Sequence, residues 1–106
     1  MSPKTLPFFF ILSFCSLLLM AGCAGPKPIE EYTLARAALQ AAKVSGATSA
    51  APGFWHRAEE NYRKGEKAFD LNDNILAKEL FERAREYAEK AENAARLQNF
   101  RTGGGF

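Results

Sequence analysis

Cys23 is the residue of this 106-residue sequence whose type and position best suit covalent chemistry. It directly follows the small residues Ala21 and Gly22, which end an uncharged, mostly apolar run over residues 8–22. A cysteine thiolate is a strong nucleophile that forms stable thioethers. Peptidases that process exported proteins need small side chains beside the bond they cut. The spacing therefore predicts an exported chain with a processing site next to a nucleophilic cysteine.

Other side chains that carry chemistry in many proteins are poorly placed for it here. His56 is the sole histidine and has no cysteine near it, so a position on the surface or at a helix start outweighs a metal or catalytic role. The acidic residues between 79 and 92 alternate with lysines and arginines instead of forming an isolated pair. A phosphate-binding loop must be followed by a helix, and the glycines at 103–105 do not have the pattern of such a loop or a helix after them. We expect no enzymatic activity, no cofactor, no metal and no small-molecule substrate.

The first 22 residues have the layout of a secretory signal peptide. Lys4 supplies a positive charge, and residues 8–22 contain no charge. A helix over this run would span about 22 Å, short of the roughly 30 Å that a transmembrane helix must cross. The sequence predicts a cleaved leader in preference to a permanent membrane span.

The tetrapeptide Met20-Ala21-Gly22-Cys23 resembles the lipobox of bacterial lipoproteins, with Met20 where leucine is commoner. The resemblance implies cleavage between Gly22 and Cys23, a diacylglyceryl group on the Cys23 sulfur, and a further acyl chain, such as palmitate, on the new amino group. Two or three acyl chains hold a protein durably at a membrane. An ordinary signal peptide followed by an unrelated cysteine is the alternative.

The residue after the lipobox bears on localisation. Lipoproteins of enteric-type bacteria that stay in the inner membrane have aspartate there, whereas this sequence has Ala24. The resemblance therefore implies the periplasmic face of the outer membrane, with the inner membrane as the weaker alternative. This inference holds only for a host with two membranes.

The mature chain is expected to be one small, nearly neutral domain. Removing residues 1–22 takes only Lys4 from the 14 basic residues and none of the 12 acidic ones. Both signs are interleaved, so the basic patch that nucleic-acid binding requires is missing. Cys15 leaves with the leader, and the Cys23 sulfur is expected to be modified, so no disulfide can form within the chain.

Apolar spacing predicts an all-α fold with helices over residues 29–44, 52–70 and 75–98. Pro52 suits a first helical turn, and Asn72 or Asp73 suits the cap of the third helix. The predicted organisation is a signal peptide over 1–22, a lipidated tether over 23–28 that lifts the domain from the lipid, an alanine-rich helical domain over 29–99 with a small-residue linker over 47–51, and a flexible tail over 100–106.

Each predicted helix carries one apolar stripe, which we expect to face the core. The stripes are Tyr32, Ala35, Leu39 and Ala42 in the first helix; Trp55, Ala58, Tyr62, Gly65 and Phe69, a coiled coil-like seam, in the second; and Ala77, Phe81, Ala84, Ala88, Ala91 and Ala95 in the third. The alanine-rich first helix buries little area and should be the least firmly held. Opposite charges four residues apart predict a solvated outer face, through Glu79–Arg83, Arg85–Glu89, Glu86–Lys90 and Glu92–Arg96.

The second and third helices should form an antiparallel helical hairpin in which the longer third helix projects beyond its neighbour. The alanines of the projecting part then need cover, either from the first helix or from a second protein. Phe54, beside the seam at the exposed start of the second helix, either caps the core or anchors a partner. The possible partner-contact residues are Phe54, Trp55, Ala88, Ala91 and Ala95.

Two family resemblances follow. Gly65, Ala77, Phe81 and Ala84 have the spacing of four signature positions of a tetratricopeptide repeat, although a solenoid needs about three repeats and this chain offers one. Nearly the whole mature chain, from the lipobox through the Ser45-Gly46-Ala47 linker to the alanine-rich third helix, resembles small bacterial lipoproteins of the domain of unknown function 4398 family. That resemblance implies a helical cell-envelope lipoprotein and no activity.

The predicted function is a membrane-anchored cell-envelope lipoprotein with a structural or protein-interaction role, whose partner is another envelope protein or a second copy. The alternative is an accessory, tetratricopeptide-like subunit of an envelope assembly or transport machine, with Phe54 and Trp55 in a helix-binding groove. An enzyme or small-molecule binder is a third class, which needs a pocket of clustered polar groups.

Overall fold

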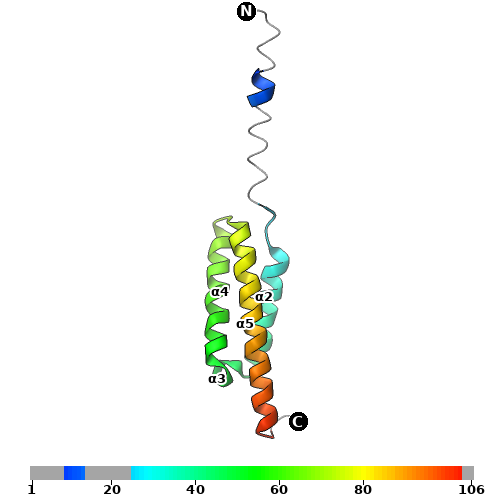
Figure 1. Ribbon diagram of the computed structural model, residues 1–106, viewed down its shortest axis with the longest axis vertical. Coiled ribbons are helices and arrows are strands. Elements are labelled where there is room, and N and C mark those ends of the chain that lie inside the picture. The colour runs from blue at the N-terminus through cyan, green and yellow to red at the C-terminus, as the bar shows by residue number, and fades with distance from the viewer. Residues whose placement is uncertain (1–8, 14–24, 104–106) are drawn as a thin grey trace, which may run out of the picture.

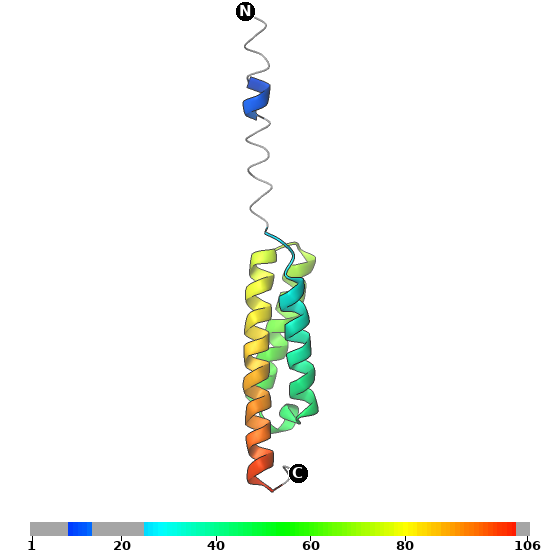
Figure 2. The ribbon, with the colours of Figure 1, turned by 90° about the vertical axis from the view of Figure 1, so that its right-hand side faces the viewer.

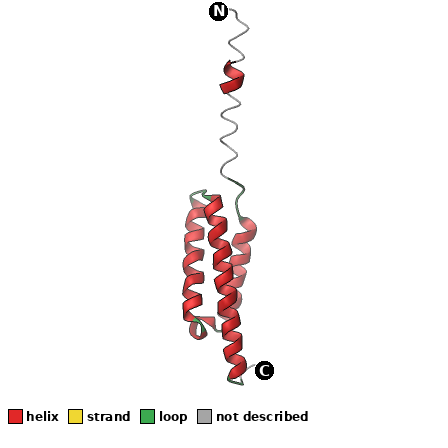
Figure 3. Ribbon diagram, in the orientation of Figure 1, coloured by secondary structure: helices red, strands yellow, loops and turns green. Residues whose placement is uncertain are grey.

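The structure is a computed structural model that describes residues 9–13 and 25–103. Its helices are α2 (Ile29–Val44), α3 (Ala47–Ala50), α4 (Pro52–Asp70) and α5 (Asn74–Arg101), and residues 9–13 are also helical. These described residues contain no strand, as Figure 3 shows. The predicted all-α fold is therefore confirmed. The predicted processing site at Gly22 and Cys23 lies outside the described residues.

The three long helices of the described chain lie side by side in a bundle built on the α4–α5 hairpin (Figures 1 and 2). α2 runs antiparallel to α4 and packs against both α4 and α5. The first helix therefore docks on the hairpin of its own chain. We call the end that holds residues 25–28 and the 71–73 turn the leader end. The far end holds α3 and the carboxyl end of α5, which extends beyond α4 as predicted.

Local signals fix the boundaries of the hairpin helices. Pro52 is the first residue of α4, where its missing N–H costs no helical hydrogen bond. Asp73 caps α5, because its side-chain oxygen accepts a hydrogen bond from the Leu76 N–H at 3.4 Å. Asn72 has a φ of 58°, a left-handed conformation that asparagine tolerates and that turns the chain between the two helices. Of the two predicted caps, Asp73 is the one used.

Two segments predicted to be irregular are partly helical. The predicted linker over 47–51 contains α3, because Gly46, with a φ of 84°, turns the chain so that Ala47 is fully buried. The third helix reaches Arg101, three residues beyond its predicted end, and so includes the start of the predicted tail. No glycine or proline interrupts this helix before Gly103, whose positive φ of 76° ends it.

The leader half of the bundle has an aromatic core around Phe81, which has no exposed surface. The centroid of the Phe81 ring lies 5.3 Å from that of Tyr32, 5.8 Å from that of Tyr62 and 6.3 Å from that of Phe69. Gly65 faces this ring from α4, and a Cβ added there would lie 2.8 Å from two ring carbons. The absence of a side chain at Gly65 therefore lets α4 approach α5 closely.

The far half has a core of small side chains around Trp55. Its other buried members are Ala42, Ala47, Ala51, Ala58, Ala88, Ala91 and Ala95. Alanine-lined helices can approach closely, although each alanine buries little area. The predicted stripes of all three long helices thus face the core, and α3 adds a part of that core which the sequence interpretation had assigned to a linker.

The aromatic core predicts a loss of stability at alkaline pH. Burial raises the pKa of Tyr62, and a hydrogen bond with Tyr32 and the charge of Glu66 raise it further. A tyrosine in an unfolded chain ionises near pH 10. Because the folded-state pKa is higher, this contribution to stability is fully present below about pH 10 and is lost as the pH rises above it.

We expect Tyr62→Phe to reduce the difference between the free energies of unfolding measured in urea at about pH 8 and about pH 11. Tyr87→Phe, at a tyrosine outside the aromatic core, is the matched control. An equal alkaline loss in the two variants would contradict the assignment to Tyr62.

Candidate interaction surfaces

Four of the five predicted partner-contact residues are buried within the chain itself. Ala88, Ala91 and Ala95 have no exposed surface, and Trp55 is 9% exposed. The expectation that these residues contact a partner is corrected, because α2 and α3 cover the face that α4 leaves open. Of the two covers considered for these alanines, the first helix is the one that the structure uses.

Phe54 is the predicted contact residue that stays accessible, with 39% of its surface exposed. It lines an open groove of about 390 Å³ between the start of α4 and the side of α5. The other lining residues are Ala50, Ala51, Gly53, Arg57 and Ala94. The groove is apolar apart from the Arg57 side chain, and it therefore suits an apolar side chain of a partner better than a polar substrate.

The apolar surface continues from this groove along the projecting end of α5. Leu97 follows Ala94 by three residues and Phe100 follows Leu97 by three, so successive members are neighbours on the helix surface. Leu97 and Phe100 are 51% and 69% exposed. We call Phe54, Ala94, Leu97 and Phe100 the far-end apolar surface. Leu97 and Phe100 were missed from the sequence, because Leu97 stands outside the predicted stripe and Phe100 lies beyond the predicted helix end at residue 98.

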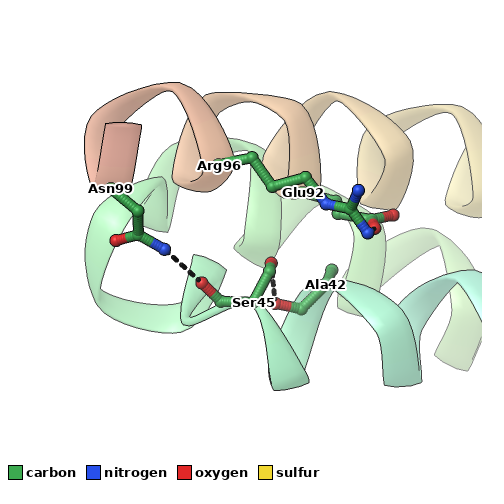
Figure 4. Close-up of polar contacts among 5 residues, drawn as sticks. All are labelled: Ala42, Ser45, Glu92, Arg96 and Asn99. Carbon is green, nitrogen blue, oxygen red and sulfur yellow. Dashed lines mark hydrogen bonds and ion pairs between the residues drawn. The ribbon is translucent and has the colours of Figure 1, made fainter. Parts of the chain in front are cut away.

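A small polar cluster fixes the end of α2 against α5 beside this surface (Figure 4). The Asn99 side-chain amide donates a hydrogen bond to the Ser45 carbonyl at 3.3 Å, and the Ser45 hydroxyl donates to the Ala42 carbonyl at 2.7 Å. Glu92 and Arg96 pair on the adjacent turns of α5. These bonds satisfy the Ala42 and Ser45 carbonyls at the end of α2. The contact between residues 45 and 99 has no signal in the sequence, because it joins positions on either side of the whole hairpin.

The outer face of α5 carries the predicted ion pairs, and α4 carries further ones. All four predicted pairs of α5 form, and Arg63–Glu59, Lys64–Glu60 and the interhelix pair Lys78–Glu31 join them. The Lys90 ammonium lowers the pKa of Glu86, and Glu86 in turn raises the pKa of Lys90. Such exposed pairs contribute little to stability. They make this a solvated face with mutually compensated charges, as predicted.

The chain that enters the bundle is held against it. The Asn74 side-chain amide donates a hydrogen bond to the Gly25 carbonyl at 3.0 Å, and Pro28 is buried. The Lys27 ammonium lies 4.5 Å from the centroid of the Phe69 ring. The described part of the predicted tether, residues 25–28, therefore packs on the leader end, where Asn74 and Phe69 supply partners for it.

The leader end also exposes large aliphatic side chains. Leu71, Ile75, Ile29 and Leu76 are 70%, 67%, 56% and 43% exposed. Each lies within the first or last turn of a helix, or directly after it, at this end. We call these four residues the leader-end apolar surface. The sequence interpretation overlooked them because they stand outside the helical stripes.

The remaining predictions about sites concern absent features. His56 is exposed at the start of α4. Within residues 9–13 and 25–103, no three His, Cys, Asp or Glu side chains are grouped as metal ligands would be. A search of the same residues finds no helix with the length and apolar character to cross a bilayer.

Comparisons with known proteins place the chain in a family. The model of the family described as Domain of unknown function (DUF4398) matches residues 30–100, which cover α2 to α5 apart from their outermost residues. No curated protein and no solved structure matches the chain. The matched region covers nearly all of the helical bundle and more than half of the sequence, and the chain therefore belongs to the DUF4398 family.

Proposed function

We propose that this protein is a lipid-anchored component of the cell envelope with a structural or protein-interaction role and no catalytic activity. Acyl chains on Cys23 would hold it at the periplasmic face of the outer membrane. Its partner would be another envelope protein or a second copy of the chain, bound through the far-end apolar surface.

The observation that carries this proposal is the order of features in the leader: a positive charge, an uncharged apolar run, two small residues and then Cys23. Two features of the bundle support an interaction role. The charged side chains on the outer face of α5 form pairs four residues apart, and the groove beside Phe54 is apolar and open. Both favour contact with a protein surface over recognition of a polar small molecule.

Intact-mass analysis of the protein purified from membranes of a two-membrane bacterium tests the anchor. We expect the mass of a chain that begins at Cys23 together with its acyl groups, and we expect Cys23→Ser to keep its leader and carry no acyl group. Separation of inner and outer membranes on a density gradient then tests the localisation. A wild-type product that is water-soluble and unmodified would contradict the proposal.

A second candidate is an accessory subunit that holds a helix of an envelope assembly or transport machine in the groove beside Phe54. The apolar lining of that groove favours it, since helices bind such surfaces through apolar side chains. The buried position of Trp55 limits the groove residues to Phe54 and its neighbours.

A photo-crosslinking amino acid at position 54 distinguishes the two candidates in cells. We expect crosslinks from position 54 and none from position 56, because His56 is exposed on the same helix but points about 160° away from Phe54. A product of twice the chain mass would identify a second copy, and a heavier product from one specific protein would favour the accessory subunit. Equal labelling from both positions would contradict a binding role for the groove.

A further inference from the structure

The leader end combines two features that the proposed function does not use. In the leader-end apolar surface, more than half of the surface of each of Leu71, Ile75 and Ile29 is exposed. In the part of the chain that the structure describes, no other segment covers them. They also lie at the same end of the bundle as residues 25–28 (Figure 1).

The position of Gly25 is fixed relative to this surface. Asn74, which is 8% exposed, donates the hydrogen bond to the Gly25 carbonyl, and the Ile75 side chain lies 3.8 Å from the point where a Gly25 Cβ would be. Two peptide links separate Gly25 from Cys23. Consecutive Cα atoms are 3.8 Å apart, so Cys23 must lie within about 8 Å of Gly25. This reach is too short to hold the bundle away from the site of acylation.

We propose that the leader-end apolar surface inserts into the lipid interface beside the acylated Cys23, so that the bundle stands on the membrane with the 71–73 turn facing the lipid. This inference rests on the proposed anchor. Apolar side chains at a membrane surface enter the boundary between headgroups and acyl chains. The covalent anchor brings Ile29, Leu71, Ile75 and Leu76 to that boundary, and their insertion removes the exposed area that the bundle leaves uncovered.

The charges around the leader-end apolar surface indicate whether electrostatic attraction or burial of apolar area drives its insertion into lipid. Lys27, Lys67 and Lys78 lie near it, but so do Asp70, Asp73 and Glu30, and all six are exposed. This mixture gives no net attraction to anionic lipid of the kind that basic patches provide. Insertion therefore depends on apolar area, and it should be the same in zwitterionic vesicles and in vesicles that contain phosphatidylglycerol.

Fluorescence quenching on the lipidated full-length protein tests the proposal. Leu71→Cys and Ile75→Cys each place a single free thiol at the leader end, since the Cys23 sulfur is acylated and Cys15 is removed with the leader. Val44→Cys is the matched control, because Val44 is an exposed aliphatic residue at the opposite end of α2. Each protein is labelled with an environment-sensitive fluorophore and reconstituted into phosphatidylethanolamine and phosphatidylglycerol vesicles that carry a nitroxide lipid labelled near the headgroup. Circular dichroism checks the fold, and flotation of the same samples checks the anchor.

We expect the nitroxide lipid to remove most of the fluorescence at positions 71 and 75 and little at position 44. If the protein floats with the vesicles but positions 71 and 75 are quenched no more than position 44, the proposed insertion is wrong and the lipid anchor is still supported. A second copy packed on this surface would give that result too, because it would shield the fluorophores from lipid. If the protein does not float and its mass shows no acyl group, the proposed lipid anchor is wrong, and the proposed orientation, which depends on the anchor, is wrong too.

Discussion

Phe81→Ala is expected to lower the free energy of unfolding by about 3–5 kcal/mol, the usual range for removal of a fully buried phenylalanine. Phe81 is the largest side chain without exposed surface in the described bundle, and three aromatic rings lie around it. Small domains lose roughly 4–8 °C of Tm per kcal/mol, so the Tm should fall by at least about 12 °C. Thermal and urea unfolding followed by circular dichroism measure both quantities.

Phe100→Ala is the matched control for this change. Phe100 is the same residue type on the same helix, but it is 69% exposed, so its removal should alter the free energy of unfolding by no more than about 0.5 kcal/mol. Similar losses in the two variants would show that the aromatic core does not hold the bundle together in the way we describe.

Gly65→Ala is expected to destabilise the bundle, although alanine favours helix over glycine by about 1 kcal/mol. The added Cβ would lie 2.8 Å from two carbons of the Phe81 ring, closer than real Cβ contacts come. The ring is fully buried with three other aromatic rings around it, so it can move away from the Cβ only by displacing its neighbours. Overpacking of this kind costs about 1–3 kcal/mol, so the net loss after the gain in helix propensity should reach as much as about 2 kcal/mol.

Gly53→Ala separates the two effects within the same helix. A Cβ at Gly53 meets nothing within 4 Å, so this variant should be neutral or more stable by up to about 1 kcal/mol. In a Phe81→Leu background, where the ring is gone, Gly65→Ala should lose most of its penalty. A Gly65→Ala protein as stable as Gly53→Ala would contradict the close approach of α4 to α5. Urea unfolding of the wild type, the two glycine variants, Phe81→Leu, and Phe81→Leu combined with Gly65→Ala provides the comparison.

The elements of the fold could be predicted because local signals mark them. The Ser45-Gly46 stop, Pro52 and Asp73 set helix boundaries through backbone geometry and capping, which act within a few residues. The heptad seam of α4 predicted its core face because only one side of the helix carries large apolar residues. The short helix α3, predicted as a linker, and the carboxyl end of α5 were missed, since short runs of small or polar residues neither stop a helix nor require one.

The candidate surfaces were harder to predict because they depend on which faces meet. An alanine stripe indicates close packing without identifying the neighbour, so Ala88, Ala91 and Ala95 were equally compatible with cover from α2 or from a second protein. The contacts of Asn74 with Gly25 and of Asn99 with Ser45 join positions about fifty residues apart, and side-chain amides have no periodicity that reveals such pairing. Phe54 was identified because it is a large aromatic residue that lies beside the seam at the exposed start of its helix.

Because the described bundle has an odd number of long helices, the chain enters it at one end, at the start of α2, and leaves it at the other, at the carboxyl end of α5. α5 alone has 28 residues, a length of about 42 Å at 1.5 Å per residue. In a chain anchored beside Gly25, the rigid bundle would therefore hold Phe100 some 40 Å above the lipid. Whatever docks on the far end would meet the protein at a set height above the bilayer, and lengthening or shortening α5 would move that meeting point by about 5.4 Å for each helical turn.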